Sequence, residues 1–357
     1  MLKETMVSYL DGEATANGAS AEIQLVTISA AGLLNGDKQT QNDLFDACKS
    51  LGFFYLDCRD HPSKSTTSLV DRISAMALDF YDLPLPSKED WAELSFDEVK
   101  GRPFAYKPAG KQEGSVKGKK DGWEGLIVSS FSIVYKPIME TPMAQLSPSS
   151  PMPGPKVLQD SVGLILETQG HLGELSRAIV AALSQSLGLT DNRSLTRYHP
   201  MDISAPTDLE ILKYLPYTPG SEKVGHIPHT DLGSISMVFA EVGGLQVFHP
   251  IKEEWMFVPP KPGHAVCNIG DSMEFFSGNI LRSSLHRVIP YKQDSEKIRL
   301  SVIHFLRPSG VAEFVGADGR QWKVADWNTM KHKQFYERQH RLEVVTRREE
   351  QNDFWTG

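Results

Sequence analysis

The sequence predicts a mainly β protein with flanking helices, an α+β arrangement whose core is a β-sandwich or barrel. Short apolar runs separated by Gly, Pro and Asn turns follow one another from residue 209 to about residue 308, which is typical of such cores. Helical periodicity lies on both sides of that stretch. The 357 residues are 40% hydrophobic and 23% charged, which is sufficient for a sizeable core in a soluble globular protein.

The sequence of residues 1–136 predicts a tail followed by a mixture of helices and strands. Residues 1–21 are small and polar and predict a loose N-terminal tail. The expected elements after it are, in order, a strand at Ile23–Ser29, a helix that ends at Gly52, a strand at Phe53–Leu56 and a helix at Leu69–Leu83. We expect residues 22–136 to pack on the core as one region.

A proline- and serine-rich segment at 137–156 separates this region from the rest of the chain. Its composition excludes a regular element and predicts a surface loop, either a lid over a site or a connector, and we favour the connector. Residues 157–345 then form the second region. It begins with one long helix over Val157–Leu187, closed by Gly188 and irregular at Gly163, Gly170 and Gly173.

From residue 209 the sequence predicts strands with no helix between them. The runs are LEILKYL, SISMVFA, GLQVFHP, WMFVPPKPG, HAVCNIGD, HRVIPY and IRLSVIHFLRP. The chain becomes helical again around Trp327–Val345. We therefore expect the catalytic core at about residues 209–308 and a helical C-terminal region after it.

Charge and cysteine content limit the partners and the compartment. The net charge of −8 argues against nucleic acid, because phosphate binding requires a clustered basic surface. Three cysteines with no paired spacing fit a reducing compartment, no signal peptide is recognisable, and no apolar stretch reaches 18 residues. We expect a cytoplasmic protein that binds a small molecule and neither a membrane nor nucleic acid.

Two histidines and an aspartate suggest a metal site. His229 and Asp231 stand at i and i+2, on one face of an extended segment, and His286 follows 55 positions after Asp231. Two neutral imidazoles and one carboxylate can occupy one face of an octahedral ion, the arrangement found in non-haem Fe(II) oxygenases, whereas zinc favours closed four-ligand sites or three ligands plus water. The nearby His226, three residues before His229, should point the opposite way if the segment is a strand.

A second spaced pair follows on a predicted strand. Arg299 and Ser301 stand at i and i+2 and can present a planar guanidinium and a hydroxyl to one carboxylate. Together, the pattern His229-x-Asp231, His286 and Arg299-x-Ser301 resembles the isopenicillin N synthase-like branch of the Fe(II)/2-oxoglutarate-dependent dioxygenases. Similar supporting segments are GGLQVF at 243–248, NIGDSMEFFSGN at 268–279, LGFFYL at 51–56 and DGWEGL at 121–126.

The resemblance implies a double-stranded β-helix, or jelly-roll, core with Fe(II) bound by His229, Asp231 and His286. It also implies that Arg299 and Ser301 bind the distal carboxylate of 2-oxoglutarate, the co-substrate that O2 decarboxylates. Tyr217 looks like the family tyrosine that also contacts 2-oxoglutarate, although Leu215 stands where the family often has asparagine. The implied reaction is oxidation of a C–H bond by hydroxylation, desaturation or oxidative cyclisation.

The substrate is expected to be a small metabolite, and by resemblance its pocket should be built from two strands and one lysine. The implied wall residues are Leu126, Val128, Lys213, Phe305 and Arg307. Lys213 and Arg307 would suit an amino acid or another carboxylated substrate if they face the pocket. The VADWNT segment and the helical C-terminus resemble those of fungal biosynthetic members, which favours specialised, or secondary, metabolism.

Two alternatives remain beside the 2-oxoglutarate-dependent oxygenase. The first is an isopenicillin N synthase-type iron oxidase, in which the Arg-x-Ser pair holds the substrate and no 2-oxoglutarate is used. The second is a non-catalytic jelly-roll binding protein, which the intact set of metal ligands disfavours.

Overall fold

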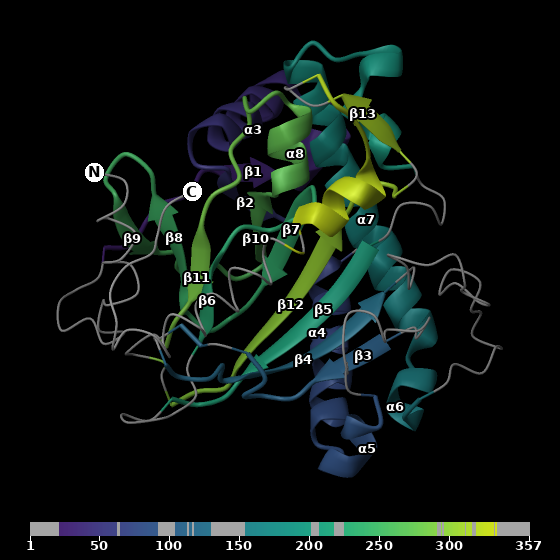
Figure 1. Cartoon of the computed structure of the whole chain (residues 1–357), viewed down its shortest axis with the longest axis vertical. Coiled ribbons are helices and arrows are strands. Elements are labelled where there is room, and N and C mark those ends of the chain that lie inside the picture. Colours follow the sequence, from purple (N-terminus) through teal and green to yellow (C-terminus); the bar gives the residue numbers. More distant parts are fainter. Residues whose placement is uncertain are drawn as a thin grey trace.

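Two β-sheets lie against each other, and helices cover the outer face of the larger sheet (Figure 1). The computed structural model describes residues 21–62, 65–91, 104–112, 114–115, 118–129, 154–200, 207–217, 225–290, 294, 296–310, 312–315, 319–331 and 333. The predicted tail at 1–21 and the predicted loop at 137–156 therefore fall almost entirely outside the described residues. No helix in these ranges combines the length and apolarity needed to cross a bilayer.

The larger sheet has eight strands and runs through the middle of the molecule. Its order is β1 (Thr27–Ser29), β2 (Phe53–Asp57), β10 (His264–Ile269), β7 (Ile235–Phe239), β12 (Arg299–Leu306), β5 (Thr207–Tyr214), β4 (Trp123–Ser129) and β3 (Phe104–Lys107). Only β1 and β2 pair in parallel within this described sheet. Strand β12 lies between β5 and β7, so residues on it are supported by a partner on each side.

The smaller sheet contains four strands and closes the barrel. Its order is β6 (His226–His229), β11 (His286–Val288), β8 (Leu245–His249) and β9 (Glu254–Phe257). Apolar side chains from both sheets form one buried cluster between them, including Tyr214, Val247 and Ile303. This arrangement is the predicted mainly β, double-stranded β-helix fold.

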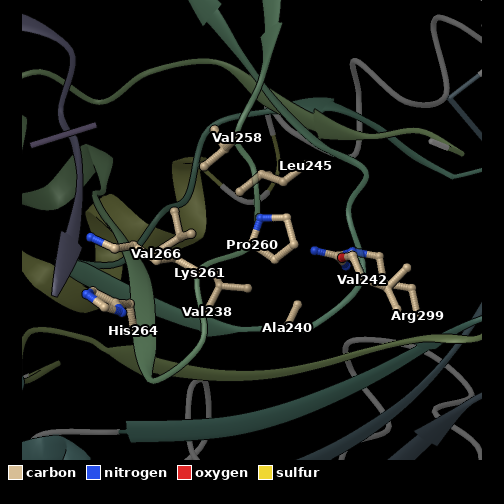
Figure 2. Close-up of a pocket in the computed structure, with 10 residues that line it drawn as sticks. All are labelled: Val238, Ala240, Val242, Leu245, Val258, Pro260, Lys261, His264, Val266 and Arg299. Atoms are coloured by element: carbon tan, nitrogen blue, oxygen red, sulfur yellow. The ribbon is translucent and has the colours of Figure 1, made fainter. Parts of the chain in front are cut away.

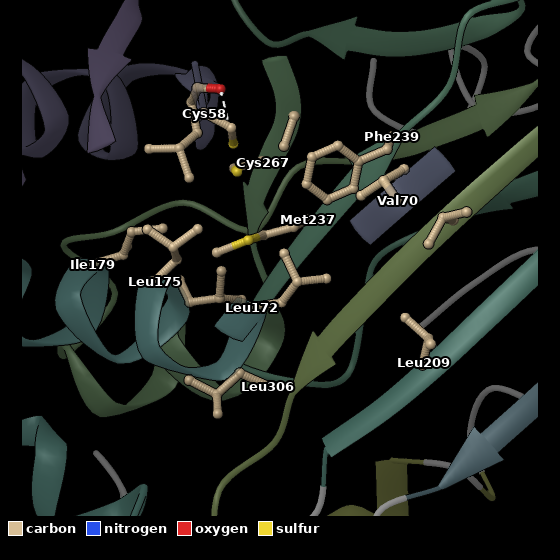
Figure 3. Packing of buried hydrophobic residues seen from close by; sticks show 14 of the residues in the cluster. Cys58, Val70, Leu172, Leu175, Ile179, Leu209, Met237, Phe239, Cys267 and Leu306 are labelled. Atoms are coloured by element: carbon tan, nitrogen blue, oxygen red, sulfur yellow. Dashed lines mark hydrogen bonds between the residues drawn. The ribbon is translucent and has the colours of Figure 1, made fainter. Parts of the chain in front are cut away.

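Three amphipathic helices pack on the outer face of the larger sheet. They are α3 (Lys38–Ser50), α4 (Thr66–Tyr81) and α7 (Val162–Ser186). Leu172, Leu175 and Ile179 of α7 recur at helical spacing and meet Met237 and Leu306 of the sheet (Figure 3). Shorter elements complete the layer, namely α2 (Ala30–Leu34), α5 (Leu85–Glu89), α6 (Lys156–Gln159) and the 3₁₀ turns Asp191–Arg193 and Leu195–Tyr198.

The predicted helix ends are confirmed where glycine supplies them. Gly52 follows α3 with φ +74°, a left-handed conformation that glycine adopts at low cost, and its amide donates to the Ala47 carbonyl. A Cβ atom there would lie 1.9 Å from the Arg282 carbonyl oxygen, so a larger residue could not be accommodated without movement. Gly188 ends α7 with φ +68° in the same way.

Several predicted elements differ from the structure in extent. The helix predicted over 157–187 is two helices, α6 and α7, separated at residues 160–161. The strand-rich region does contain a helix, α8 (Asp271–Phe276), and a hairpin of β13 (Glu313–Val315) and β14 (Gln321–Lys323) precedes the C-terminal helix, which is described over 324–331. In the predicted strand at 23–29, only Thr27–Ser29 is regular.

Candidate active site

The three predicted metal ligands converge at one end of the smaller sheet. His229 at the end of β6 pairs in register with His286 at the start of β11, and Asp231 follows β6 directly. The Asp231 Oδ1 atom lies 3.7 Å from His229 Nε2 and 3.6 Å from His286 Nε2. Ligand atoms that each lie about 2 Å from one ion are separated by about 3–4 Å, so the spacing fits a bound metal ion.

Hydrogen bonds from backbone carbonyls fix both imidazole rings. His229 Nδ1 lies 2.8 Å from the Ile227 carbonyl oxygen, and His286 Nδ1 lies 3.1 Å from that of Ser284. A protonated Nδ1 donates to each carbonyl and leaves both Nε2 lone pairs directed at Asp231. The donor set is therefore two neutral nitrogens and one carboxylate oxygen.

The two carboxylate oxygens of Asp231 have different partners. Its Oδ2 accepts hydrogen bonds from Ser236 Oγ at 2.6 Å and from Asn268 Nδ2 at 2.7 Å, while Oδ1 faces the histidines. Gly270 lets this loop pack closely, because a Cβ there would lie 2.2 Å from the Gly233 carbonyl oxygen. Neither Ser236 nor Asn268 stood out in the sequence as a site residue, although Asn268 begins the NIGDSMEFFSGN segment.

Burial and neighbouring groups shift the pKa values of His229 and Asp231 toward the protonation states that bind a metal ion. Burial and the neighbouring His286 lower the pKa of His229 to about 4, so its imidazole is neutral at physiological pH. Burial alone would raise the pKa of Asp231, but His286, His229 and the hydrogen bonds to Oδ2 outweigh it and hold that pKa below its ordinary value. The Asp231 carboxylate is therefore ionised beside the neutral His229 ring.

The prediction that His226 points away from His229 is wrong. The four residues of β6 from His226 to His229 oppose only three of β11, from Val288 to His286, so the pairing contains a one-residue irregularity. The extra residue brings both rings to the same side, where they stack with centroids 4.4 Å apart. The Trp123 ring lies on His226 with centroids 5.0 Å apart and the two planes tilted by 41°.

Arg299 and Ser301 lie on the interior face of β12, as their spacing predicts. Arg299 is 6% exposed, donates from Nη1 to Ser301 Oγ, and donates from Nε to the Val242 carbonyl at 3.1 Å. Its guanidinium carbon lies 5.1 Å from the centre of the Tyr214 ring, on the neighbouring strand β5. A buried guanidinium beside a hydroxyl has the donors that one carboxylate needs.

Two cavities meet at Arg299. One is walled by aliphatic residues such as Val238, Leu245 and Val266, and its space is about 320 Å³ including its mouth (Figure 2). Tyr214 and Tyr217 line the other. Tyr217 and Arg299 line the same cavity, and the contact of Tyr217 with 2-oxoglutarate stays a prediction. Tyr214 faces Arg299 in register, and the sequence did not indicate it because a tyrosine within a strand carries no signal for its face.

Known proteins are similar to this chain in sequence and in fold. Residues 206–308 match the family model described as the 2OG-Fe(II) oxygenase superfamily, and residues 23–137 match the one described as non-haem dioxygenase in morphine synthesis N-terminal. A 2-oxoglutarate-dependent dioxygenase of Gibberella zeae is 28% identical over 308 residues, 86% of each chain. The 2-oxoglutarate-dependent dioxygenase iboH of Amanita muscaria is 37% identical over 161 residues, 44% of this chain and 78% of that relative.

The chain belongs to the 2OG-Fe(II) oxygenase superfamily. It is a 2-oxoglutarate- and Fe(II)-dependent oxygenase of small metabolites, and the oxidase alternative is not favoured. A full-length Neurospora crassa protein crystallised in complex with alpha-KG has the same fold, with a TM-score of 0.68, 18% identity and coverage of 89% of this chain and 98% of that one. The JOX2 structure in complex with 2OG, Fe and JA has a TM-score of 0.65, 21% identity and coverage of 88% and 87%.

Leu126 and Val128 do not line a pocket in this oxygenase, which corrects the prediction. Both are fully buried in the cluster between the larger sheet and the helices. Alternate residues of a strand point to opposite faces, and Trp123 belongs to the cluster between the sheets. The barrel-facing residues of β4 are therefore Trp123, Gly125 and Ile127.

Lys213 also lies on the helix side of the oxygenase, contrary to prediction. Its Nζ is 3.6 Å from Glu124 Oε2 and 5.2 Å from the centre of the Tyr81 ring, and both of these partners are on the helix side. Glu124 accepts from Lys88 as well, so Lys213 belongs to a buried polar network beneath α4 and α5. It cannot bind a substrate between the sheets without a change of face.

Phe305 and Arg307 do lie on the barrel side. Phe305 packs against the cluster between the sheets. Arg307 Nε lies 2.6 Å from Asp208 Oδ2, and its Nη2 lies 3.8 Å from Glu210 Oε1. Burial lowers the pKa of Arg307, but Asp208, Glu210 and Asp231 together raise it above its ordinary value, which ties this group electrostatically to the metal-ligand end.

Proposed function

We propose that His229, Asp231 and His286 bind Fe(II), and that Arg299 and Ser301 bind the distal carboxylate of 2-oxoglutarate. The observation that carries this is the convergence of two imidazole Nε2 atoms on one carboxylate oxygen. Two nitrogens and one oxygen on one side leave the rest of an octahedral ion open, as a non-haem iron oxygenase requires. Bound Fe(II) would couple the decarboxylation of 2-oxoglutarate by O2, with release of succinate and CO2, to oxidation of a substrate C–H bond.

The chain itself contributes binding, orientation and charge. Arg299 supplies a buried cation, and Tyr214 restricts its guanidinium from one side. The backbone bonds to His229 and His286 hold the rings in the required tautomer, and Ser236 with Asn268 keeps Asp231 in one orientation. The reaction can be hydroxylation, desaturation or oxidative cyclisation.

Anaerobic reconstitution tests both binding roles in one experiment. Metal-stripped protein is given Fe(II) and then 2-oxoglutarate, and the visible charge-transfer absorption of the chelate is recorded. We expect the band in the wild type, its loss in Asp231→Ala, and its appearance only at much higher 2-oxoglutarate in Arg299→Ala. A wild-type protein that binds Fe(II) but develops no band with 2-oxoglutarate would contradict the proposal.

We propose that the substrate is an amino acid or a related metabolite with both a cationic and an anionic group. Arg307 offers a guanidinium, while Glu210 and Asp208 place two carboxylates within 4 Å of it, and Phe305 supplies an apolar wall. A zwitterion would find a partner for each charge at this end of the barrel. Substrate-stimulated succinate release, measured over a panel of amino acids and their N-acetyl and amide derivatives, tests this, with the derivatives expected to be inactive.

We further propose that the oxygenase acts in the cytoplasm, in specialised metabolism, without a membrane or nucleic-acid partner. All three cysteines, Cys48, Cys58 and Cys267, are free and buried, which suits a reducing compartment. The net charge of −8 disfavours binding to phosphate backbones. The fungal relatives named as 2-oxoglutarate-dependent dioxygenases support a biosynthetic role.

A further inference from the structure

A second cluster of metal-ligating side chains lies on the helix side of the molecule. His61 follows β2, and His171 and Glu174 belong to α7; one ligand atom from each lies within 4.8 Å of the others. The proposed iron ligands belong to the smaller sheet and the loop after β6, whereas α7 covers the outer face of the larger sheet (Figure 1). The two clusters are therefore separate, and nothing in the oxygenase reaction requires the second one.

The sequence of α7 and the start of α4 orient two of these ligands. His171 and Glu174 are three residues apart on a helix and so occupy the same face. His171 is 2% exposed, and its Nε2 lies 2.8 Å from Thr66 Oγ1 in the first turn of α4. With Nε2 engaged by Thr66, the remaining ligand atom of this ring is Nδ1. A metal-binding histidine usually donates its other ring N–H to an oxygen acceptor, and the Thr66 hydroxyl oxygen can take that role for His171.

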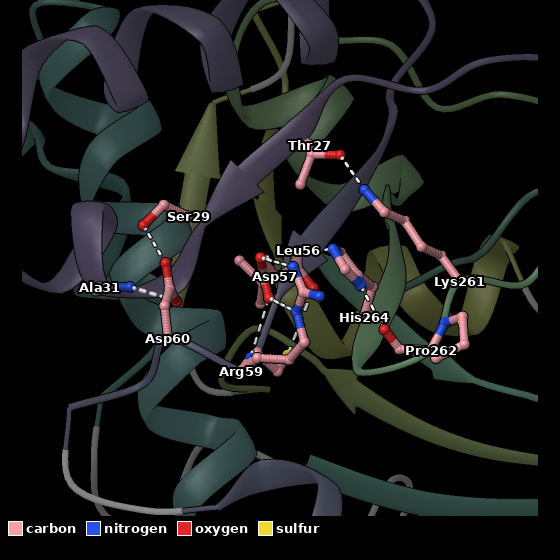
Figure 4. Close-up of polar contacts among 11 residues, drawn as sticks. Thr27, Ser29, Ala31, Leu56, Asp57, Arg59, Asp60, Lys261, Pro262 and His264 are labelled. Atoms are coloured by element: carbon pink, nitrogen blue, oxygen red, sulfur yellow. Dashed lines mark hydrogen bonds and ion pairs between the residues drawn. The ribbon is translucent and has the colours of Figure 1, made fainter.

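His61 is presented by an anchored turn. The preceding residue, Asp60, accepts hydrogen bonds from Ser29 Oγ at 2.5 Å and from the Ala31 amide at 3.1 Å (Figure 4). The His61 and His171 rings then lie with centroids 4.5 Å apart at 65°. The proposed iron ligands His229 and His286 have nearly the same relation, 4.3 Å and 53°.

We propose that His61, His171 and Glu174 form a second divalent-cation site, which an ion of borderline softness such as Zn2+ would occupy. Two imidazoles and one carboxylate are a common three-ligand set for zinc, with water in the fourth position. His171 is buried and Glu174 is exposed, so the open position faces solvent. A bound ion would tie the segment after β2 to α7.

Zinc binding to full-length protein whose iron site has been removed tests this site. The background is Asp231→Ala with His286→Ala, stripped of metal and dialysed against Zn2+, and bound zinc is counted by mass spectrometry. We expect one ion per chain, with affinity reduced at least about tenfold by either His61→Asn or Glu174→Gln. Both substituted residues lie at or near the surface, so the fold should survive. Glu167→Gln, on the same helix and paired at 3.9 Å with exposed Arg72, is the matched control and should bind zinc normally.

A second readout separates a real site from surface adsorption. Zn2+ should raise the melting temperature of the background protein and of the Glu167→Gln control, and should leave that of the Glu174→Gln variant unchanged. Binding of no zinc by the background protein, or equal binding by all four proteins, would overturn the proposal.

Discussion

Asp231 is the residue on which the proposed iron site depends most. Its replacement by alanine should abolish turnover and iron binding, because two imidazoles alone neither complete the ligand set nor offset the charge of the ion. Asn268→Ala, which removes a donor from Asp231 Oδ2 only, should lower iron affinity by about 10–100-fold while the fold is retained. Titration of metal-stripped protein with Fe(II) measures both effects. Normal iron content and rate in Asp231→Ala would refute the assignment.

Arg299 should control affinity for 2-oxoglutarate independently of iron. Removing a buried charged partner from a carboxylate costs about 2–5 kcal/mol, so Arg299→Ala should weaken 2-oxoglutarate binding by roughly 30- to several-thousand-fold. Arg299→Lys should restore only part of the affinity, because an ammonium cannot replace the planar fork. Fe(II) binding, measured in parallel, should be unchanged in both variants.

The outcome that separates the two enzyme hypotheses is turnover without the co-substrate. Wild-type protein should release about one succinate for each substrate oxidised, with some excess if turnover is partly uncoupled. Full-rate turnover with no 2-oxo acid present and no succinate formed would mean that Arg299 and Ser301 bind the substrate, and the oxidase hypothesis would then replace the present one.

The two faces of strand β4 have different roles, and its helix-side face contributes to stability. Leu126 is fully buried beneath the helices, so Leu126→Ala should lower the free energy of unfolding by about 2–5 kcal/mol and leave 2-oxoglutarate affinity unchanged. Urea denaturation measures the first quantity. Leu78→Ala, at a 40% exposed position of α4, is the control and should cost far less. Normal stability with weakened substrate binding in Leu126→Ala would return this residue to the pocket.

The strands themselves were predictable, but the direction of their side chains was not. Alternating apolar runs and turn residues located β5 and β7 to β12, because both signals are local. The face that Leu126 or Lys213 presents depends on pairing with a distant strand, and His226 changed face through one irregularity in the pairing of β6 with β11. Helix α8 was missed because six residues are too few to display helical periodicity.

The main residues of the candidate site could be predicted from the sequence, but the residues that support them could not. His229, Asp231, His286, Arg299 and Ser301 follow from spacing and family resemblance, and the structure brings the first three together. Their supporting residues, Ser236 and Asn268, come from two different strands of the larger sheet. No spacing in the sequence links either of them to Asp231, so only the fold reveals them.

The packing of helices on the larger sheet buries His199 and His304, which belong to neither of the two proposed metal sites. His199 bonds through Nδ1 to the Leu195 carbonyl and through Nε2 to Ser234 Oγ, whereas neither ring nitrogen of His304 has a hydrogen-bond partner in the described structure. Burial lowers the pKa of His199 to about 4 and that of His304 to about 3. The folded protein therefore binds fewer protons than the unfolded chain at mildly acidic pH.

Stability should consequently fall as the pH drops below about 6.5, the ordinary pKa of histidine in an unfolded chain, and the loss should continue toward the folded-state values. Above pH 7 this contribution is complete and constant. Between pH 7.5 and pH 5, the free energy of unfolding of His304→Leu should fall by about 2 kcal/mol less than that of wild type. Urea denaturation of metal-free protein measures this free energy. Equal pH dependence in wild type and His304→Leu would contradict this account.

The two ligand-binding strands differ in how firmly the sheets hold them. Strand β12 is flanked on both sides, whereas the four-residue β6, which contains Pro228, is the last strand of the smaller sheet in the described structure. Amide hydrogens of β6 should therefore exchange with deuterium much faster than those of β12 in the metal-free protein, and added Fe(II) should slow β6 selectively. The proposed 2-oxoglutarate site on β12 would then be formed even without metal, while the strand carrying His229 would become rigid only when Fe(II) binds.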